Sequence, residues 1–349
     1  MPPSASTQRF IAHKLLSLPA PILRLMSGGG VVYQGGRTLD PRIQFLAAQA
    51  RNAPPMQVLT PPDARAASAG GIALVTGDPE PGVRVESLTI EGPAGAIPAR
   101  AYRPEAQAPD APLLVYAHMG GGVIGDLDTC HTFCTILAKV ARAPVISVDY
   151  RLAPEHRFPT GLEDMLAAVR WGRDNADRFG APKGAVAVGG DSMGGGFAAT
   201  VCQALRKAKE PQPALQLLIY PWVDVACESA SMTIYGESYP LTRALLDWFA
   251  AHYMGAADHP SDPRLSPLAE PDLAGLAPAV VVTAGFDPLV DQGEAYARKL
   301  KAAGVPVAYR CYDSLSHGFT AFTGAVPCAD VACREIAGLV REGFEGRIA

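Results

Sequence analysis

A serine between glycines, directly after an apolar run, is the stretch of this chain best suited to chemistry. Gly190, Ser192 and Gly194 form the pattern Gly-x-Ser-x-Gly after the apolar residues 186–188, and helix-forming residues follow over 197–205. Strand, tight turn and helix in this order are typical of a nucleophile elbow, in which the serine hydroxyl is exposed at the carboxyl end of the strand. The first turn of the helix directs free N–H groups toward the same point, where they favour an oxyanion. We therefore predict that Ser192 is a nucleophile.

A serine hydroxyl attacks a carbonyl only when a base removes its proton, and an acid must orient that base. Of the seven histidines, only His317 comes directly after a predicted strand, which covers residues 307–312. In folds with this elbow the chain order is serine, acid, histidine, each on a loop after a strand. Asp287 fits the acid because it follows the predicted strand 279–284, and Asp291, one helical turn farther on, is the reserve candidate.

A glycine-rich loop over residues 118–122 follows another apolar run, 113–117. Glycines let the backbone approach a substrate oxygen without obstruction by side chains, so we expect this loop to supply further N–H donors to an oxyanion. His118 begins the loop, and we interpret it as a residue that holds the loop by hydrogen bonds rather than one that transfers protons.

Apolar runs that alternate with helical segments must position these residues. Predicted strands cover residues 113–117, 144–149, 186–191, 215–220, 279–284 and 307–312, and the segment 83–102 reads as a hairpin at a sheet edge. Continuous apolar strands between helices indicate a parallel sheet that is covered on both faces. The fold class is therefore α/β.

One interruption, residues 221–278, is too long for a plain crossover and contains a helical pattern over 241–254, which suggests a lid over the strand ends. A helix predicted from Pro41, with Asp40 as its N-cap, would join this lid. We expect residues 1–50 to form an N-terminal helical extension and part of a cap, 51–220 the first part of a catalytic core, 221–278 the cap insertion, and 279–349 the second part of the core.

Composition excludes several function classes. A net charge of −4 without clusters of Lys or Arg argues against a nucleic-acid partner. Pro19 and Pro21 break the N-terminal apolar segment, so we expect no integral membrane span and no signal peptide. We interpret this segment as an amphipathic helix that caps the protein or contacts a partner; the alternative is an anchor on a membrane surface. Seven scattered cysteines favour reduced thiols in a cytoplasmic protein, with no metal site and no cofactor.

Six motifs together resemble the bacterial members of the hormone-sensitive-lipase family of α/β-hydrolase esterases, from about residue 39 to the C-terminus. They lie at residues 118–121, 125–129, 149–156, 190–195, 287–289 and 317–319. The resemblance implies the α/β-hydrolase fold, a mostly parallel central sheet with helices on both faces and a helical cap. It also implies a catalytic triad of Ser192, Asp287 and His317, and an oxyanion hole made by the backbone N–H groups of Gly120, Gly121 and Met193.

Two departures from the family pattern concern the glycine loop, which in the family usually reads His-Gly-Gly-Gly followed by an aromatic residue. Anchored on residues 125–128, the alignment puts Met119 at the first glycine and Gly122 at the aromatic position; the alternative is that Met119 is an insertion. We expect Met119, Gly122 and Asp191 to line the substrate pocket, and the missing ring at Gly122 to leave space for bulky esters.

The prediction for the whole chain is a carboxylic-ester hydrolase that acts on small-molecule esters with short to medium acyl chains through an acyl-enzyme. An amide or peptide hydrolase and a non-catalytic small-molecule receptor on the same fold are the alternatives. A homodimer is a possible assembly.

Overall fold

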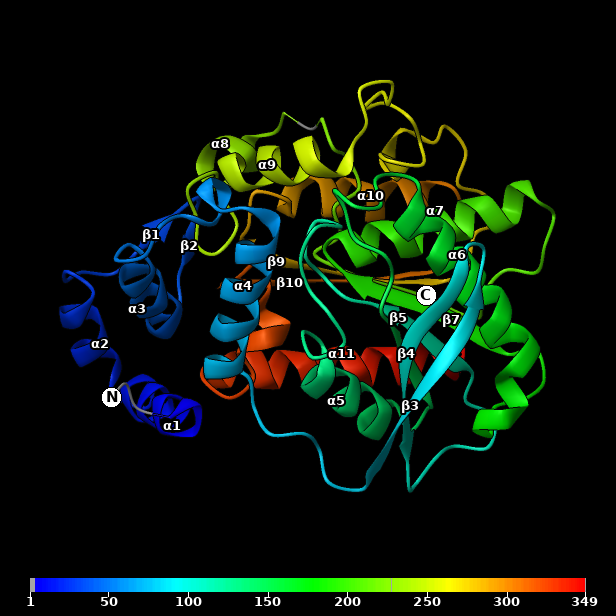
Figure 1. Cartoon of the computed structure of the whole chain (residues 1–349), viewed down its shortest axis with the longest axis horizontal. Coiled ribbons are helices and arrows are strands. Elements are labelled where there is room, and N and C mark those ends of the chain that lie inside the picture. The colour runs from blue at the N-terminus through cyan, green and yellow to red at the C-terminus, as the bar shows by residue number, and fades with distance from the viewer. Residues whose placement is uncertain (1–3, 227, 349) are drawn as a thin grey trace.

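An eight-stranded sheet forms the centre of the computed structural model, which describes residues 4–226 and 228–348 (Figure 1). Its strands are β3 (Val83–Gly92), β4 (Gly95–Pro104), β5 (Leu113–Ala117), β6 (Val145–Val148), β7 (Val186–Asp191), β8 (Gln216–Ile219), β9 (Ala279–Phe286) and β10 (Val307–Ser316). They lie in the order β10-β9-β8-β7-β5-β6-β4-β3. Pairing is parallel from β10 to β6, and β4 and β3 add an antiparallel hairpin at the edge. The predicted α/β class, parallel sheet and edge hairpin are confirmed.

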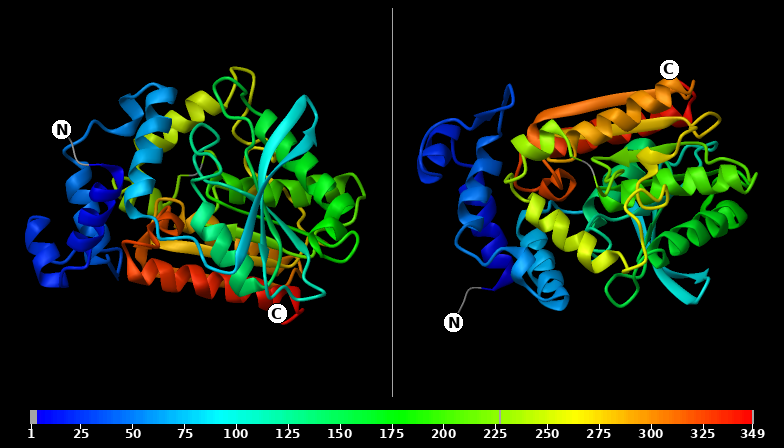
Figure 2. Two further views of the ribbon diagram at one scale, coloured as in Figure 1. Left: turned by 60° about the horizontal axis from the view of Figure 1, so that its bottom comes forward. Right: turned by 90° about the horizontal axis from the view of Figure 1, so that it is seen from above.

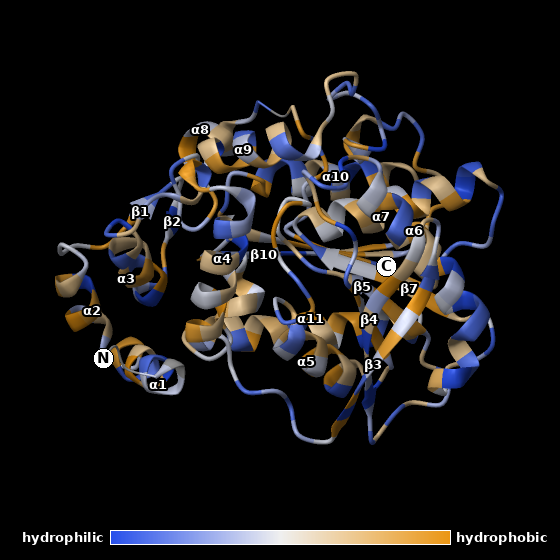
Figure 3. Ribbon diagram, in the orientation of Figure 1, coloured by the Kyte–Doolittle hydropathy of each residue, from blue (hydrophilic) through white to orange (hydrophobic). Residues whose placement is uncertain are grey.

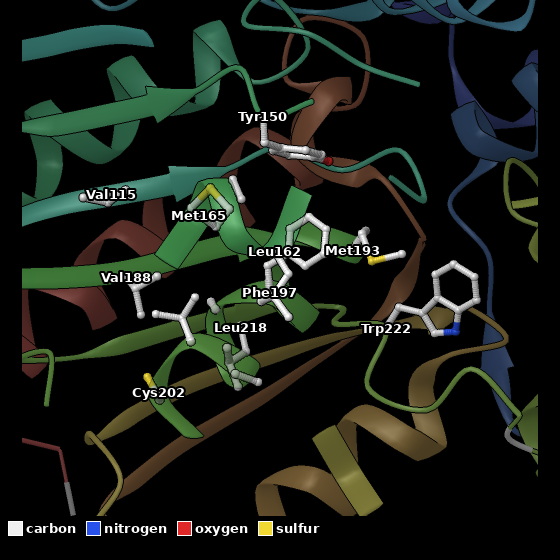
Figure 4. Packing of buried hydrophobic residues seen from close by; sticks show 14 of the residues in the cluster. Val115, Tyr150, Leu162, Met165, Val188, Met193, Phe197, Cys202, Leu218 and Trp222 are labelled. Carbon is white, nitrogen blue, oxygen red and sulfur yellow. The ribbon is translucent and has the colours of Figure 1, made fainter. Parts of the chain in front are cut away.

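Helices cover both faces of the sheet. α5 (His131–Ala141) and α11 (Pro327–Phe344) lie on one face, and α6 (Thr160–Asn175), α7 (Met193–Lys207) and α10 (Val290–Ala302) lie on the other. Successive strand residues point to opposite faces. In β5, Val115 packs toward α6 and α7, whereas its neighbours Leu114 and Tyr116 pack toward α5 and α11. Figure 4 shows the hydrophobic core between the sheet and helices α6 and α7, which includes Val188 of β7 and Phe197 of α7.

The remaining helices stand beside the sheet or above its carboxyl edge. α1 (Ala5–Leu16), α2 (Ala20–Met26), α3 (Pro41–Ala50) and α4 (Pro61–Val75) form one flank of the molecule, together with the short strands β1 (Tyr33–Gln34) and β2 (Arg37–Thr38) (Figure 2). α8 (Ala230–Ile234) and α9 (Arg243–Tyr253) lie in the segment between β8 and β9. Four single turns are η1 (Met56–Val58), η2 (Ala176–Phe179), η3 (Pro267–Ala269) and η4 (Phe319–Phe322).

The helix α4 is not among the elements that the sequence predicts. Its interior contains Ser68 and the pair Gly70 and Gly71, which are poor helix formers. The helix nevertheless begins at a standard cap, because the hydroxyl of Thr60 accepts from the N–H of Asp63. The prediction of a helix from Pro41 is confirmed, since a carboxylate oxygen of Asp40 accepts from the N–H of Arg42 at 2.7 Å.

The helices of the N-terminal flank and those around the sheet alike mix hydrophobic and hydrophilic residues along their length (Figure 3). Within residues 4–226 and 228–348, no helix is both long and apolar enough to cross a membrane. Large apolar side chains are nevertheless exposed on α1, on α2, on the loop that follows and on β1: Phe10, Ile11, Ile22, Leu25, Met26, Val31 and Tyr33. α1 and α2 thus bury one face, through Leu16 and Leu23, and expose another that is also apolar.

Candidate active site

Ser192 occupies a strained turn between β7 and α7. Its backbone has φ 57° and ψ −117°, a region that residues other than glycine rarely adopt and that costs about 1–3 kcal/mol. The flanking glycines are required because strand and helix touch: a Cβ on Gly194 would overlap the carbonyl oxygen of Ala117, and one on Gly190 would overlap the backbone of Gly194. The strand, turn and helix predicted around Ser192 are confirmed.

Two further loops bring an imidazole and a carboxylate to this serine. Nε2 of His317, just beyond β10, lies 2.9 Å from Oγ of Ser192, and Nδ1 of the same ring lies 2.8 Å from Oδ2 of Asp287, just beyond β9. The other oxygen of Asp287 accepts from the N–H of Leu289 at 2.8 Å. Since a carboxylate only accepts, Nδ1 carries the proton and Nε2 is free to accept one from the hydroxyl. All three side chains are buried, with relative exposures of 6% or less.

The reserve candidate Asp291 is used elsewhere. One of its carboxylate oxygens accepts from the N–H of Ser231, at 2.8 Å, and thereby fastens α8 to α10. Only Asp287 of the two aspartates is hydrogen-bonded to His317.

The glycine loop and the start of α7 present unused N–H groups. Gly120 and Gly121 have positive φ values of 128° and 61°, and a Cβ on Gly120 would overlap the carbonyl oxygen of Ile124. Among the described residues, no acceptor is hydrogen-bonded to the N–H of Gly120, Gly121 or Met193. The side chain of Met193 is buried in the core beside Phe197, so only its backbone is available (Figure 4).

A cavity of about 720 Å³ opens beside Ser192 and His317. Its walls come from α3, α4, α9, η4 and the glycine loop, and they are mainly apolar. The cavity-lining residues that the sequence did not predict include Ile72, Val75, Trp222, Leu245, Leu246 and Phe249. A helical repeat of apolar residues at 245, 246 and 249 was the one available signal for α9, and it does not distinguish a core face from a cavity wall.

Of the three predicted pocket residues, Met119 lines the cavity and Gly122 does not. Gly122 faces Tyr253 of α9, whose Cδ2 would lie 2.7 Å from a Cβ on the glycine. The neighbouring Gly121 lies against the ring of Phe249 in the same way. The expectation of empty space at Gly122 is therefore wrong, because aromatic rings from a distant helix fill it.

Asp191 is also misplaced by the prediction. It is only 1% exposed and lies behind the elbow, where one carboxylate oxygen accepts from the hydroxyls of Tyr220 at 3.0 Å and Thr320 at 2.9 Å. Burial raises the pKa of this carboxyl. The physical reason is strand alternation: Asp191 shares the face of Ala187, which packs toward α5 and α11, whereas the cavity lies above the strand ends.

His118 is fully buried at the start of the glycine loop. Its Nδ1 lies 2.7 Å from the carbonyl oxygen of Met119, and its ring stacks on Tyr150 with 4.3 Å between centroids. The Tyr150 hydroxyl donates to the carbonyl of His118 at 2.8 Å. Burial lowers the pKa of His118 to about 4, so the ring is neutral at pH 7. These contacts hold the loop.

The part of the chain that the structure describes contains no group of three His, Cys, Asp or Glu side chains arranged to hold a metal ion. Its six cysteines, Cys130, Cys134, Cys202, Cys311, Cys328 and Cys333, are free thiols.

A mostly parallel sheet with an elbow serine, a histidine and an aspartate at the ends of three of its strands defines an α/β hydrolase. A family model described as alpha/beta hydrolase fold matches residues 114–321, and the chain belongs to this family. The carboxylic ester hydrolase LipN of Mycobacterium tuberculosis is 45% identical over 310 residues, which are 86% of this chain and 82% of LipN. The ethyl acetate hydrolase of Pseudomonas putida is 38% identical and covers 79% of this chain and 88% of its own.

Solved structures of ester hydrolases are similar to the fold of this chain. The ester hydrolase EH1AB1 from the metagenome of Lake Arreo, complexed with a derivative of bipyridine phosphonate, superimposes with a TM-score of 0.84. It is 42% identical and covers 88% of this chain and 99% of its own. The resemblance to bacterial hormone-sensitive-lipase relatives that the sequence motifs indicate is confirmed.

Proposed function

We propose that this protein hydrolyses carboxylic esters with short to medium acyl chains through an acyl-enzyme on Ser192. The observation that carries the proposal is the chain of hydrogen bonds from Ser192 through His317 to Asp287 at the wall of an apolar cavity. The relatives named above are ester hydrolases, and the enzyme class of this chain is theirs.

In the proposed cycle, Nε2 of His317 takes the proton of Ser192 while Oγ attacks the ester carbonyl carbon. Asp287 holds the imidazole in the correct tautomer and stabilises the imidazolium that forms. The N–H groups of Gly120, Gly121 and Met193 receive the oxyanion, which removes the need for solvent to reorganise. His317 then protonates the leaving alcohol, and a water molecule activated by the same ring releases the acid.

The test is the variant Ser192→Ala with a chromogenic acetate ester. Because the three residues act as a unit, we expect turnover to fall by about 10⁴–10⁶-fold, with no burst of released alcohol. An unchanged circular dichroism spectrum would show that the variant is folded. Turnover within tenfold of the native protein would refute Ser192 as the nucleophile.

Related measurements distinguish ester hydrolysis from the two alternatives, a non-catalytic receptor and an amide hydrolase. A receptor would bind esters without any burst from the native protein. An amide hydrolase must protonate a leaving amine, so matched ester and amide substrates with the same acyl group distinguish the two activities. We expect the ester to be preferred, and a kcat/KM for the amide as large as that for the ester would contradict the proposal.

For the organisation of the chain, we propose that residues 1–50 and 221–278 form a cap over a core made of 51–220 and 279–349, with the exception of α4, which lies within 51–220 but belongs to the cap. Support comes from the cavity walls, which α3, α4 and α9 supply together.

The free thiols of the described cysteines support a cytoplasmic location. The exposed apolar side chains of α1 and α2 support a homodimer.

A further inference from the structure

The strand that leads to His317 is irregular just before the histidine. β10 pairs with β9 from Val307 to Tyr312, the pairing is then interrupted, and it resumes where Ser316 lies opposite Phe286. Residues 313–315 of β10 therefore lie opposite the single residue Gly285 of β9. Bulges of this kind redirect the side chains that follow them. The direction of the imidazole thus depends on how this bulge is held.

One arginine from the N-terminal flank holds the bulge. Nε of Arg37, in β2, donates to Oδ1 of Asp313 at 2.9 Å, and Nη1 donates to the carbonyl oxygen of Gly285 at 3.3 Å and to the hydroxyl of Tyr235 at 3.2 Å. β2 contacts β10 directly. Three residues after Arg37, the N–H of Asp40 donates to the carbonyl oxygen of Ser314 at 3.0 Å.

The bulge and Gly285 lie close to the reacting groups along the chain. Gly285 is two residues before Asp287, and Asp313 is four residues before His317. The strands also touch here, since a Cβ on Gly285 would overlap the carbonyl oxygen of Asp313. A single guanidinium therefore connects the end of the strand that carries the acid with the end of the strand that carries the base.

We propose that Arg37 is a positioning residue for ester hydrolysis, which fixes the β10 bulge against β9 and so aims His317 at Ser192. Arg37 contacts neither the cavity nor the reacting atoms. It lies at a separate surface hollow of about 410 Å³, together with Asp313 and Ser314. The inference rests on the proposed function, because it assigns His317 the role of base.

A displacement of about 1 Å in a reacting group can cost about 100-fold in rate. We therefore expect Arg37→Ala to lower kcat by about 10- to 100-fold for a chromogenic acetate ester. KM should stay within twofold because the cavity walls are unchanged. Arg37→Lys keeps the charge, but its compact ammonium group cannot reach Asp313, Gly285 and Tyr235 at once as the planar guanidinium does. It should therefore give an intermediate kcat.

Arg9 offers a matched control on the same flank. Its guanidinium also donates to a carboxylate, Asp78 at 2.8 Å, and to a backbone carbonyl, Thr76 at 3.0 Å, but it contacts neither the β9 nor the β10 strand end. Arg9→Ala should therefore lose comparable contacts while kcat stays within twofold of the native value. Thermal unfolding midpoints of both variants would show the cost in stability separately.

Chemical rescue gives a readout that a loss of stability cannot imitate. The hollow beside Arg37 is open to small solutes, so millimolar ethylguanidinium should restore part of the kcat of Arg37→Ala and leave Arg9→Ala unchanged. If Arg37→Ala does not fold, Asp313→Ala, which removes one of the three contacts, takes its place and should also lower kcat with KM unchanged.

Failure of this inference is distinguishable from failure of the proposed function. If Ser192→Ala is inactive but Arg37→Ala or Asp313→Ala has the same kcat as Arg9→Ala, the positioning role is overturned. A rise in KM with kcat unchanged would also overturn it. Residual turnover of Ser192→Ala would instead overturn the proposed function itself.

Discussion

The two histidines near Ser192 differ in what surrounds them. His317 has a carboxylate on one side and a hydroxyl on the other, whereas His118 has a backbone carbonyl and the face of Tyr150. The burial of His118 lowers its pKa to about 4. The glycine loop is therefore held by an uncharged ring at the pH where the enzyme is expected to work.

This burial predicts an acid-sensitive stability. A histidine in the unfolded chain has a pKa of about 6.5. Between pH 6.5 and 4 the folded protein therefore binds fewer protons than the unfolded chain. The free energy of unfolding decreases as the pH is lowered through this range, by at most about 3 kcal/mol from this group. We expect His118→Gln to reduce the pH dependence measured by urea unfolding at pH 7, 5.5 and 4. His259→Gln, in an exposed loop, is the control. Equal pH dependence in the native protein and His118→Gln would contradict the prediction.

The two candidate acids give a second prediction at this scale. Asp287→Asn should lower kcat/KM by about 10⁴-fold, because an amide that donates to Nδ1 leaves the imidazole in the wrong tautomer. Asp291→Asn should cost less than tenfold, since Asp291 contacts α8 and not His317. Measured kcat/KM values in the reverse order would move the acid to Asp291.

At the scale of elements, α9 determines the shape of the site. The ring of Phe249 lies against Gly121 and lines the cavity. Tyr253, one helical turn farther on, lies against Gly122 and packs on Phe158 and Phe197. The cap insertion thus presses directly on the loop that carries two of the proposed oxyanion donors.

Phe249→Ala should widen the cavity beside Ser192. We expect kcat/KM for a bulky ester to rise about tenfold relative to that for an acetate ester, since single methylene contacts are worth about 1–3 kcal/mol in such pockets. Tyr253→Leu, outside the cavity, should leave the ratio unchanged. The same ratio in all three proteins would show that α9 does not select substrates by size.

The sequence predicted the elements whose patterns are local. The parallel strands were recognisable because they are continuous apolar runs, and Ser192, Asp287 and His317 because each follows such a run. For α4 the cap at Thr60 was the local signal, but the serine and glycines in its interior argue against a helix, which tertiary packing of Ala64 and Val75 supports. Neither the ring over Gly122 nor the link from Arg37 to Asp313 has a local signal, because each joins residues more than 100 positions apart.

The whole molecule has an uneven distribution of charge and apolar surface. Four of its 30 basic residues and none of its 34 acidic residues lie in residues 1–39, on the flank that exposes Phe10 and Leu25. Because Arg9 and Arg37 are paired with carboxylates of the same chain, the exposed apolar side chains of the flank, rather than its charge, favour contact with a second copy.

We therefore expect sedimentation equilibrium to give twice the 36.5 kDa mass of the chain. The double variant Phe10→Ser/Leu25→Ser should be monomeric and should keep its kcat. Val331→Ser, which removes an exposed apolar side chain from α11, should remain dimeric. A native protein that is monomeric throughout the micromolar range would contradict the homodimer.

The link between Arg37 and Asp313 has a consequence for how the enzyme is made. These residues are 276 positions apart. At about 5–20 residues per second, the ribosome needs roughly 15–55 s to go from one to the other. The elbow serine is synthesised well within that interval, whereas His317 and the carboxylate that anchors its strand are added near the end of the chain. A nascent chain that has passed Ser192 but not reached His317 therefore carries the nucleophile without its base, and we expect it to be inactive toward esters.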